Sequence, residues 1–211
     1  MFYGAIHEDT IYSINKKEIP NELYHMNRKL NLYEYIIPNN GDIITKITAQ
    51  DYYDKYRYLS IEEFEKYKGG ICWDYVHYEH NDIQLEHKCF YVMFDDKKDY
   101  PTHTFIIYKY NNRYYWFESS WKSHIGIFVY KSEYDALSSI IFELYSYLQN
   151  TENIKNYYMS IYDPNSIPIG YTCQQFMDFQ SKIVKKYFVN QIKYVKPIMS
   201  VNTDQLKNFK Y

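Results

Sequence analysis

Residues 103–118 read HTFIIYKYNNRYYWFE, two runs of aromatic and β-branched residues joined by Asn111 and Asn112. Such runs favour β-strands, and asparagine tolerates the positive φ that a tight turn requires. The stretch therefore predicts an antiparallel hairpin. Because the outer ends of antiparallel strands lie side by side, the side chains of His103 and Glu118 are expected to come close together.

Two helices are predicted upstream of this hairpin. Residues 60–63, SIEE, form a capping box, in which the serine hydroxyl and the second glutamate satisfy each other's backbone amides. The glycines at 69–70 end that helix, and a second helix is expected from Cys72 to Leu85. The exposed amides and the dipole at a helix N-terminus favour a thiolate, so Cys72 is a candidate nucleophile.

The rest of the chain continues the alternation of strands and helices. Strands are expected at CFYVMF (89–94), at GIFVY (126–130) and at Tyr158–Tyr162, and helices at 132–148 and 173–188. Residues 1–50 are expected to be extended and irregular, with YEYIIPNNGDIITKITA (33–49) forming two short strands around a turn. The pattern predicts one α+β domain over residues 1–211, with a core at about 50–190 and an N-terminal extension at 1–50.

The composition excludes several classes of protein. The chain has 211 residues and a net charge of −2, which leaves no basic surface for nucleic acid. No apolar run approaches the roughly 18 residues of a membrane span, and the N-terminus lacks the pattern of a signal peptide. Three widely spaced cysteines do not form a disulfide framework. We therefore expect a cytoplasmic protein that binds neither membrane nor nucleic acid.

Three motifs carry a resemblance to a known family. GICWDYV (70–76), THTFIIYK (102–109) and YYWFESSW (114–121) resemble the transglutaminase-like group of papain-like cysteine enzymes, over roughly residues 57–135. The resemblance implies a papain-like, transglutaminase-like fold in which a nucleophile helix packs on an antiparallel sheet. It differs at one position, because the family more often has aspartate where this chain has Glu118.

By position in these motifs, the resemblance implies a catalytic triad. Cys72 would be the nucleophile, His103 the base and Glu118 the carboxylate that orients the imidazole. Trp73 and Trp121 would wall the substrate site, and the Cys72 amide would contribute to an oxyanion hole. The implied reaction is acyl transfer from a peptide bond or a glutamine carboxamide through a thioester. Transfer to water gives a protease, peptidase or deamidase, and transfer to an amine gives a transglutaminase. The partner is a peptide or protein substrate, and no cofactor is required.

Two alternatives use the same fold differently. Cys173, in GYTCQQF, also follows a glycine at a predicted helix start, so a circularly permuted papain-like hydrolase could pair it with His103. Alternatively, the domain could be a catalytically inert scaffold that binds a protein partner through its aromatic residues. The reactivity of the thiols distinguishes these possibilities, because a core cysteine stays inert.

Histidines are concentrated just after the predicted nucleophile. The segment HYEHNDIQLEHKC holds His77, His80, His87 and Cys89, and the first two lie one turn apart on the predicted helix. Their spacing matches no zinc motif, so histidines on a solvated helix face are the favoured interpretation and no metal site is assigned. A metal-dependent enzyme remains an alternative. Cys89 begins an apolar strand and is interpreted as a core residue.

Overall fold

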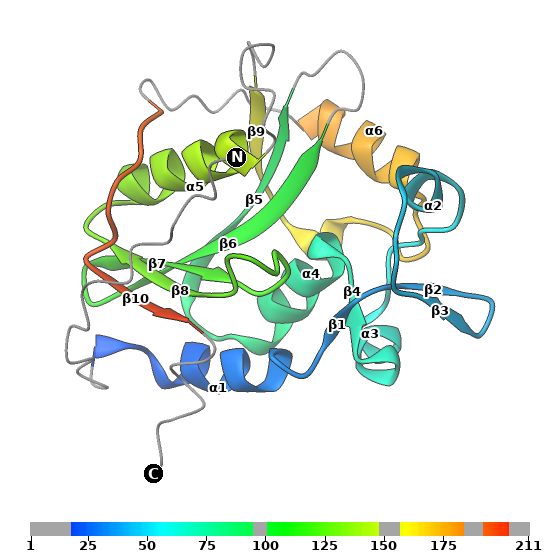
Figure 1. Ribbon diagram of the computed structural model, residues 1–211, viewed down its shortest axis with the longest axis horizontal. Coiled ribbons are helices and arrows are strands. Elements are labelled where there is room, and N and C mark those ends of the chain that lie inside the picture. The colour runs from blue at the N-terminus through cyan, green and yellow to red at the C-terminus, as the bar shows by residue number, and fades with distance from the viewer. Residues whose placement is uncertain (1–17, 95–100, 148–156, 184–191, 203–211) are drawn as a thin grey trace, which may run out of the picture.

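The protein is built around one antiparallel sheet, as the computed structural model shows (Figure 1). The structure describes residues 18–94, 101–147, 157–183 and 192–202. The sheet has six strands in the order β10-β8-β7-β6-β5-β9. Their bounds are β5 Glu86–Phe94, β6 Thr102–Tyr110, β7 Arg113–Glu118, β8 Gly126–Tyr130, β9 Tyr157–Tyr162 and β10 Met199–Asn202. The α+β class with an antiparallel sheet is therefore confirmed.

Both faces of the sheet are covered by apolar side chains, which explains why its strands are apolar at successive positions. In β8, Ile127 and Val129 belong to one buried cluster, and Phe128 and Tyr130 lie in or against the other. Side chains alternate between the two faces of a strand, so each cluster receives every second residue. The sheet is thus the middle layer between two hydrophobic cores.

Helices cover the two faces unequally. α1 (Asn21–Leu30), α3 (Ile61–Tyr67), α4 (Cys72–Asp82) and α6 (Cys173–Ile183) contribute to one core, and α5 (Glu133–Tyr147) covers the other face. A short α2 (Ala49–Asp54) and the 3-10 turn η2 (Pro164–Ser166) complete the helical segments of the described residues. In Figure 1, α5 and α6 lie at opposite sides of the molecule, with the curved strands β5 and β6 between them. None of the described helices is long and apolar enough to cross a lipid bilayer.

Most predicted elements are present, with shifted ends. The hairpin turns at Asn111 and Asn112, which have positive φ values of 47° and 56°. The capping box at Ser60 forms as expected, with both reciprocal hydrogen bonds. α4 ends at Asp82 and not at Leu85, because the backbone of Ile83 is already extended towards β5. The predicted ends of the later helices, at 148 and 188, lie outside the described residues.

The expectation for the N-terminal fifty residues is wrong in one part and confirmed in another. Residues 21–30 form α1, an amphipathic helix that buries Leu23, Met26 and Leu30 in the main core. Although most residues of this segment are polar, the helical spacing of its three apolar residues is enough to make it an amphipathic helix. The two short strands are confirmed as β2 (Ile37–Asn39) and β3 (Asp42–Ile44), which pair antiparallel. Residues 1–17 lie outside the described part of the chain.

Candidate active site

Two glycines determine how the chain approaches α4. β4 (Gly69–Gly70) pairs in parallel with β1 (Glu34–Tyr35). A Cβ atom at Gly69 would lie 2.1 Å from the backbone oxygen of Glu34, and one at Gly70 would lie 2.6 Å from Cβ of Asp74. Only glycine permits so close an approach. The Gly-Gly pair therefore lets β1 lie directly beside the start of α4.

Asp74 holds the first turn of α4 in place. Its carboxylate accepts hydrogen bonds from the amide of Ile71 at 2.8 Å and the amide of Leu59 at 3.0 Å. The hydroxyl of Tyr56 donates a third bond at 2.9 Å. Burial raises the pKa of Asp74 to about 7, against the lowering effect of these three donors. This network fixes the position of Cys72, the first residue of α4.

Cys72, His103 and Glu118 come together at one end of the sheet. Nε2 of His103 lies 2.9 Å from Oε2 of Glu118, and the Cys72 side chain lies close enough to His103 to raise the pKa of its imidazole. Because Glu118 occupies Nε2, Nδ1 is the ring nitrogen left to face the thiol. The ladder between β6 and β7 ends at the pair of Ile106 and Phe117. His103 on β6 and Glu118 on β7 therefore lie at the open end of the hairpin, beyond the part in which β6 and β7 are paired with each other.

The carboxylate of Glu118 is held on both oxygens. While Oε2 faces His103, Oε1 accepts hydrogen bonds from the amide of Ser120 at 2.9 Å, the Ser120 hydroxyl at 3.0 Å and the amide of Trp121 at 2.7 Å. The residue is 1% exposed. A buried carboxylate with this many donors is fixed in orientation and remains charged. The side chain of Glu118 is thus long enough to reach the imidazole and is held there.

The charged forms of His103 and Glu118 stabilise each other. Burial alone would lower the pKa of His103, but the charge of Glu118 and hydrogen bonds with Cys72 and Glu118 raise it to about 10. Burial would likewise raise the pKa of Glu118, and the charge and hydrogen bond of His103, with the amides of Trp121 and Ser120, lower it instead. At neutral pH His103 is therefore an imidazolium, which is suited to pair with a thiolate.

Two tyrosines lie next to Cys72. The Tyr35 hydroxyl lies near the backbone amide of Cys72 and 2.5 Å from the Tyr52 hydroxyl. Burial, with the nearby Cys72 and Tyr52, raises the pKa of Tyr35 well above its usual value, so the hydroxyl keeps its proton. The amide expected in the oxyanion hole therefore has a tyrosine hydroxyl close to it.

A pocket of about 310 Å³ opens at Cys72. The residues that line it are mostly aromatic or apolar: Tyr35, Ala49, Tyr52, Tyr53, Ile71, Cys72, Trp73, Pro101, Thr102, Cys173 and Met177. None of these described residues is charged. The pocket therefore suits a neutral side chain, and its hydroxyl groups offer hydrogen bonds to a polar one.

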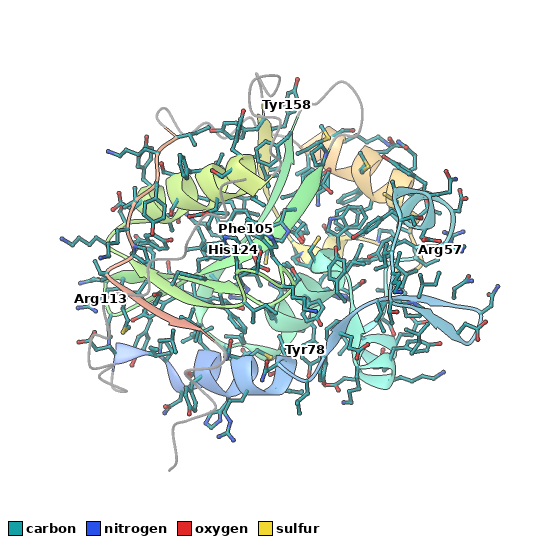
Figure 2. The ribbon with its side chains drawn as sticks, in the orientation of Figure 1. Arg57, Tyr78, Phe105, Arg113, His124 and Tyr158 are labelled. Atoms are coloured by element: carbon teal, nitrogen blue, oxygen red, sulfur yellow. The ribbon has the colours of Figure 1, made fainter. Side chains whose placement is uncertain are left out.

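The two tryptophans expected to wall the site have different surroundings. Trp73 is among the residues that line the pocket, and its ring stacks on Phe176 with centroids 3.7 Å apart. Trp121 lies instead against His103, with ring centroids 5.9 Å apart, and stacks on His124 at 3.7 Å. The labels of His124 and Phe105, a neighbour of His103 on β6, mark this region in Figure 2. Trp121 thus contacts the imidazole, and Trp73 contacts the pocket.

Cys173, the alternative nucleophile, lies in the same pocket. Its sulfur is 3.9 Å from the sulfur of Met177. Burial, with the nearby Cys72, raises the pKa of Cys173 to about 11. The groups that raise the pKa of the His103 imidazole are Glu118 and Cys72. Of the two thiols in the pocket, Cys72 therefore has the activating environment.

His77 belongs neither to the group of Cys72, His103 and Glu118 nor to the residues that line the pocket. Its Nδ1 atom lies 3.2 Å from the backbone oxygen of Leu59, and its ring stacks on Tyr58 with centroids 5.0 Å apart. The residue is buried, so it does not lie on a solvated helix face as expected. Burial lowers its pKa and keeps the ring neutral.

Sequence reasoning did not identify Tyr35 or Tyr52 as part of the site. Both lie in the segment treated as an extension and its junction, and they are two of 29 tyrosines in the chain. The only feature of the sequence that points towards them is the pair Gly69–Gly70. It indicates that another backbone segment packs closely there, but it does not identify that segment.

Comparison with known proteins gives no match to a family model, a curated protein or a solved structure.

Proposed function

We propose that the protein is a cysteine-dependent acyl-transfer enzyme with a papain-like, transglutaminase-like fold, acting on amide groups of peptides or proteins. The observation that carries this proposal is the connected series of Cys72, His103 and Glu118 next to a pocket. A core cysteine needs no imidazolium beside it and no buried carboxylate behind that ring. The imidazole and the carboxylate are fixed by hydrogen bonds, as preorganised catalysis requires.

The proposed reaction starts from a Cys72 thiolate and a His103 imidazolium. The Cys72 thiolate attacks the carbonyl carbon of the amide, and the carbonyl oxygen becomes an oxyanion. His103, as imidazolium, gives its proton to the departing amine, which leaves a thioester on Cys72. A water molecule or an amine then attacks the thioester, His103 takes up its proton, and the acid or the new amide is released as the thiolate re-forms. Glu118 keeps the ring oriented throughout.

The oxyanion requires a donor, and the Cys72 amide is the proposed one. Since the Tyr35 hydroxyl lies close to this amide, the substrate oxygen competes with that hydroxyl for it. The described residues that line the pocket are uncharged, which favours an uncharged side chain, such as the carboxamide of glutamine, over an acidic or basic one.

The proposal is tested by trapping the acyl-enzyme. The protein is incubated with a glutamine-containing peptide and with an activated acetyl ester, quenched in acid, and analysed by intact mass and peptide mapping. The expected result is an acyl group on Cys72 that is absent in Cys72→Ala and retained in Cys173→Ser. Acylation of Cys173, or of neither cysteine with either reagent, would contradict the proposal. Dansylcadaverine incorporated into casein, or its absence beside released ammonia or new peptide termini, separates transfer from hydrolysis.

A further inference from the structure

A second cluster of reactive side chains lies at the opposite end of the nucleophile helix. His80 is in the last turn of α4, and His87 and Cys89 are in the first half of β5. Nδ1 of His80, Nε2 of His87 and Sγ of Cys89 all lie within 4.8 Å of one another. Along α4, His80 is eight residues from Cys72, about 12 Å at the rise of a helix. The cluster is therefore separate from the candidate active site.

The donor atoms have nearly the spacing of a tetrahedral zinc site. With Zn–N of about 2.05 Å and Zn–S of about 2.3 Å, tetrahedral geometry places two nitrogens about 3.3 Å apart and a nitrogen and a sulfur about 3.6 Å apart. Nδ1 of His80 lies 3.6 Å from Sγ of Cys89 and 2.8 Å from Nε2 of His87. The imidazoles would move apart by only about 0.5 Å to hold an ion.

The number of protons available on the imidazoles of His80 and His87 also favours a bound cation. Nδ1 of His87 lies 2.6 Å from the backbone oxygen of Leu85 and donates its proton there, so Nε2 of His87 is an acceptor. Both nitrogens of His80 face acceptors, because Nδ1 faces His87 and Nε2 lies 3.3 Å from Oδ1 of Asp163. A neutral imidazole has one proton for these two acceptors.

An ion between the imidazoles resolves this shortage. Nδ1 of His80 would coordinate the ion, and the proton would move to Nε2 and bond to Asp163. Each histidine would then bind metal through one nitrogen and donate from the other, to the Leu85 carbonyl or to the Asp163 carboxylate. This is the usual arrangement of zinc-binding histidines in proteins.

The surroundings are electronegative as well. Oδ1 of Asp163 lies 3.3 Å from Nε2 of His80. The C-terminal end of α4, where His80 lies, carries the negative end of the helix dipole. These surroundings favour a divalent cation.

We propose that His80 Nδ1, His87 Nε2 and Cys89 Sγ bind one Zn²⁺ ion, with water as the fourth ligand, and that the ion fastens the end of α4 to β5. Binding forms the Zn–S bond and releases the thiol proton, with no change of oxidation state. Imidazole and thiolate together select zinc-class ions over Mg²⁺ and Ca²⁺, which prefer oxygen ligands. The ion does not enter the acyl-transfer reaction.

Cobalt titration of the full-length, chelator-treated protein tests this proposal, because Co²⁺ substitutes for zinc and reports a thiolate ligand by its charge-transfer absorption in the near ultraviolet. The expected result is a band that saturates at one equivalent and is displaced by Zn²⁺. The band should be lost in Cys89→Ser and in His87→Gln. It should persist in Cys173→Ser and in His25→Gln, which removes an exposed histidine outside the cluster. No band in the wild-type protein, or a band that survives Cys89→Ser, would overturn the proposal.

A second measurement needs no variant and covers the case in which the variants fail to fold. Wild-type protein is alkylated under partly denaturing conditions with and without Zn²⁺, and each cysteine is quantified by mass spectrometry. Cys89 should be protected by Zn²⁺ by tenfold or more. The Tm should rise by about 5 °C or more at a free Zn²⁺ concentration a hundred times the Kd. Equal alkylation of Cys89 in both conditions would count against the site.

Discussion

Replacing Glu118 with glutamine tests whether the carboxylate orients His103, because the substitution changes charge and proton donors while keeping the shape. Oε1 of Glu118 already accepts from the amides of Ser120 and Trp121. In Glu118→Gln the amide oxygen keeps those bonds, and the amino group then faces Nε2 of His103. That nitrogen must become an acceptor, so the proton moves to Nδ1, which faces the thiol. The base is then in the wrong tautomer.

The size of the effect follows from the same contact. The pKa of His103 rises from 6.5 to about 10 through Glu118 and Cys72, so loss of the carboxylate charge removes a large part of the imidazolium's stability. The corresponding change of carboxylate to amide in a serine protease lowers turnover by about 10,000-fold. We expect kcat to fall roughly 1,000- to 10,000-fold in Glu118→Gln, with KM changed less than threefold.

The assay is single-turnover acylation of Cys72, followed by mass spectrometry. Glu143→Gln is the matched control, because Glu143 also pairs with a histidine, His124, at 3.4 Å and lies outside the proposed triad. Near-ultraviolet circular dichroism establishes that both variants fold. An acylation rate for Glu118→Gln within tenfold of wild type would refute the assigned role of the carboxylate.

Three further predictions concern the surroundings of the triad. In Tyr35→Phe the hydroxyl that lies close to the Cys72 amide is removed and no longer competes with the substrate oxygen, so kcat/KM for a small ester should rise about 2- to 10-fold, the worth of one hydrogen bond; a fall would mean that Tyr35 assists the reaction, and Tyr53→Phe is the control. The raised pKa of His103 stabilises the folded state fully below pH 6.5, so the free energy of unfolding in urea should fall as pH rises from 6.5 towards 10, by up to about 1.4 kcal/mol per pH unit; a slope unchanged in His103→Gln would contradict this. Gly69→Ala places a Cβ against the backbone of Glu34 and should destabilise the protein by about 1–3 kcal/mol, whereas Gly41→Ala, whose Cβ meets no atom within 4 Å, should show only the cost of its positive φ; equal losses in chemical denaturation would argue against the close-approach role.

Local patterns predicted the elements that depend on local interactions. The hairpin follows from aromatic strands joined by Asn111 and Asn112, and the start of α3 follows from the reciprocal bonds of Ser60 and Glu63. The hairpin also predicted that His103 and Glu118 lie close together, although the two side chains meet beyond the last paired residues of the β6–β7 ladder, Ile106 and Phe117. These features need only neighbours along the chain or across one ladder, which is why a single sequence can indicate them.

Features that depend on distant segments could not be predicted in this way. Tyr35 lies close to Cys72 because β1 pairs with β4. No sequence motif predicts this contact between residues 34–35 and 69–70. His80, His87 and Cys89 meet because α4 ends at Asp82 and the chain reverses into β5. The spacing of these residues along the sequence matches no zinc motif, since the helix end and the strand register bring them together.

The most direct test of the central claim is the reactivity of each cysteine towards iodoacetamide between about pH 5 and pH 9, measured on the native protein by mass spectrometry. The account predicts that Cys72 is alkylated rapidly at the acidic end of this range, because His103 holds it as a thiolate, and that this reactivity disappears in His103→Ala. Cys173 and Cys89 should react slowly, since burial raises the pKa of both. Slow alkylation of Cys72 at acidic pH, or rapid alkylation that persists without His103, would contradict the account.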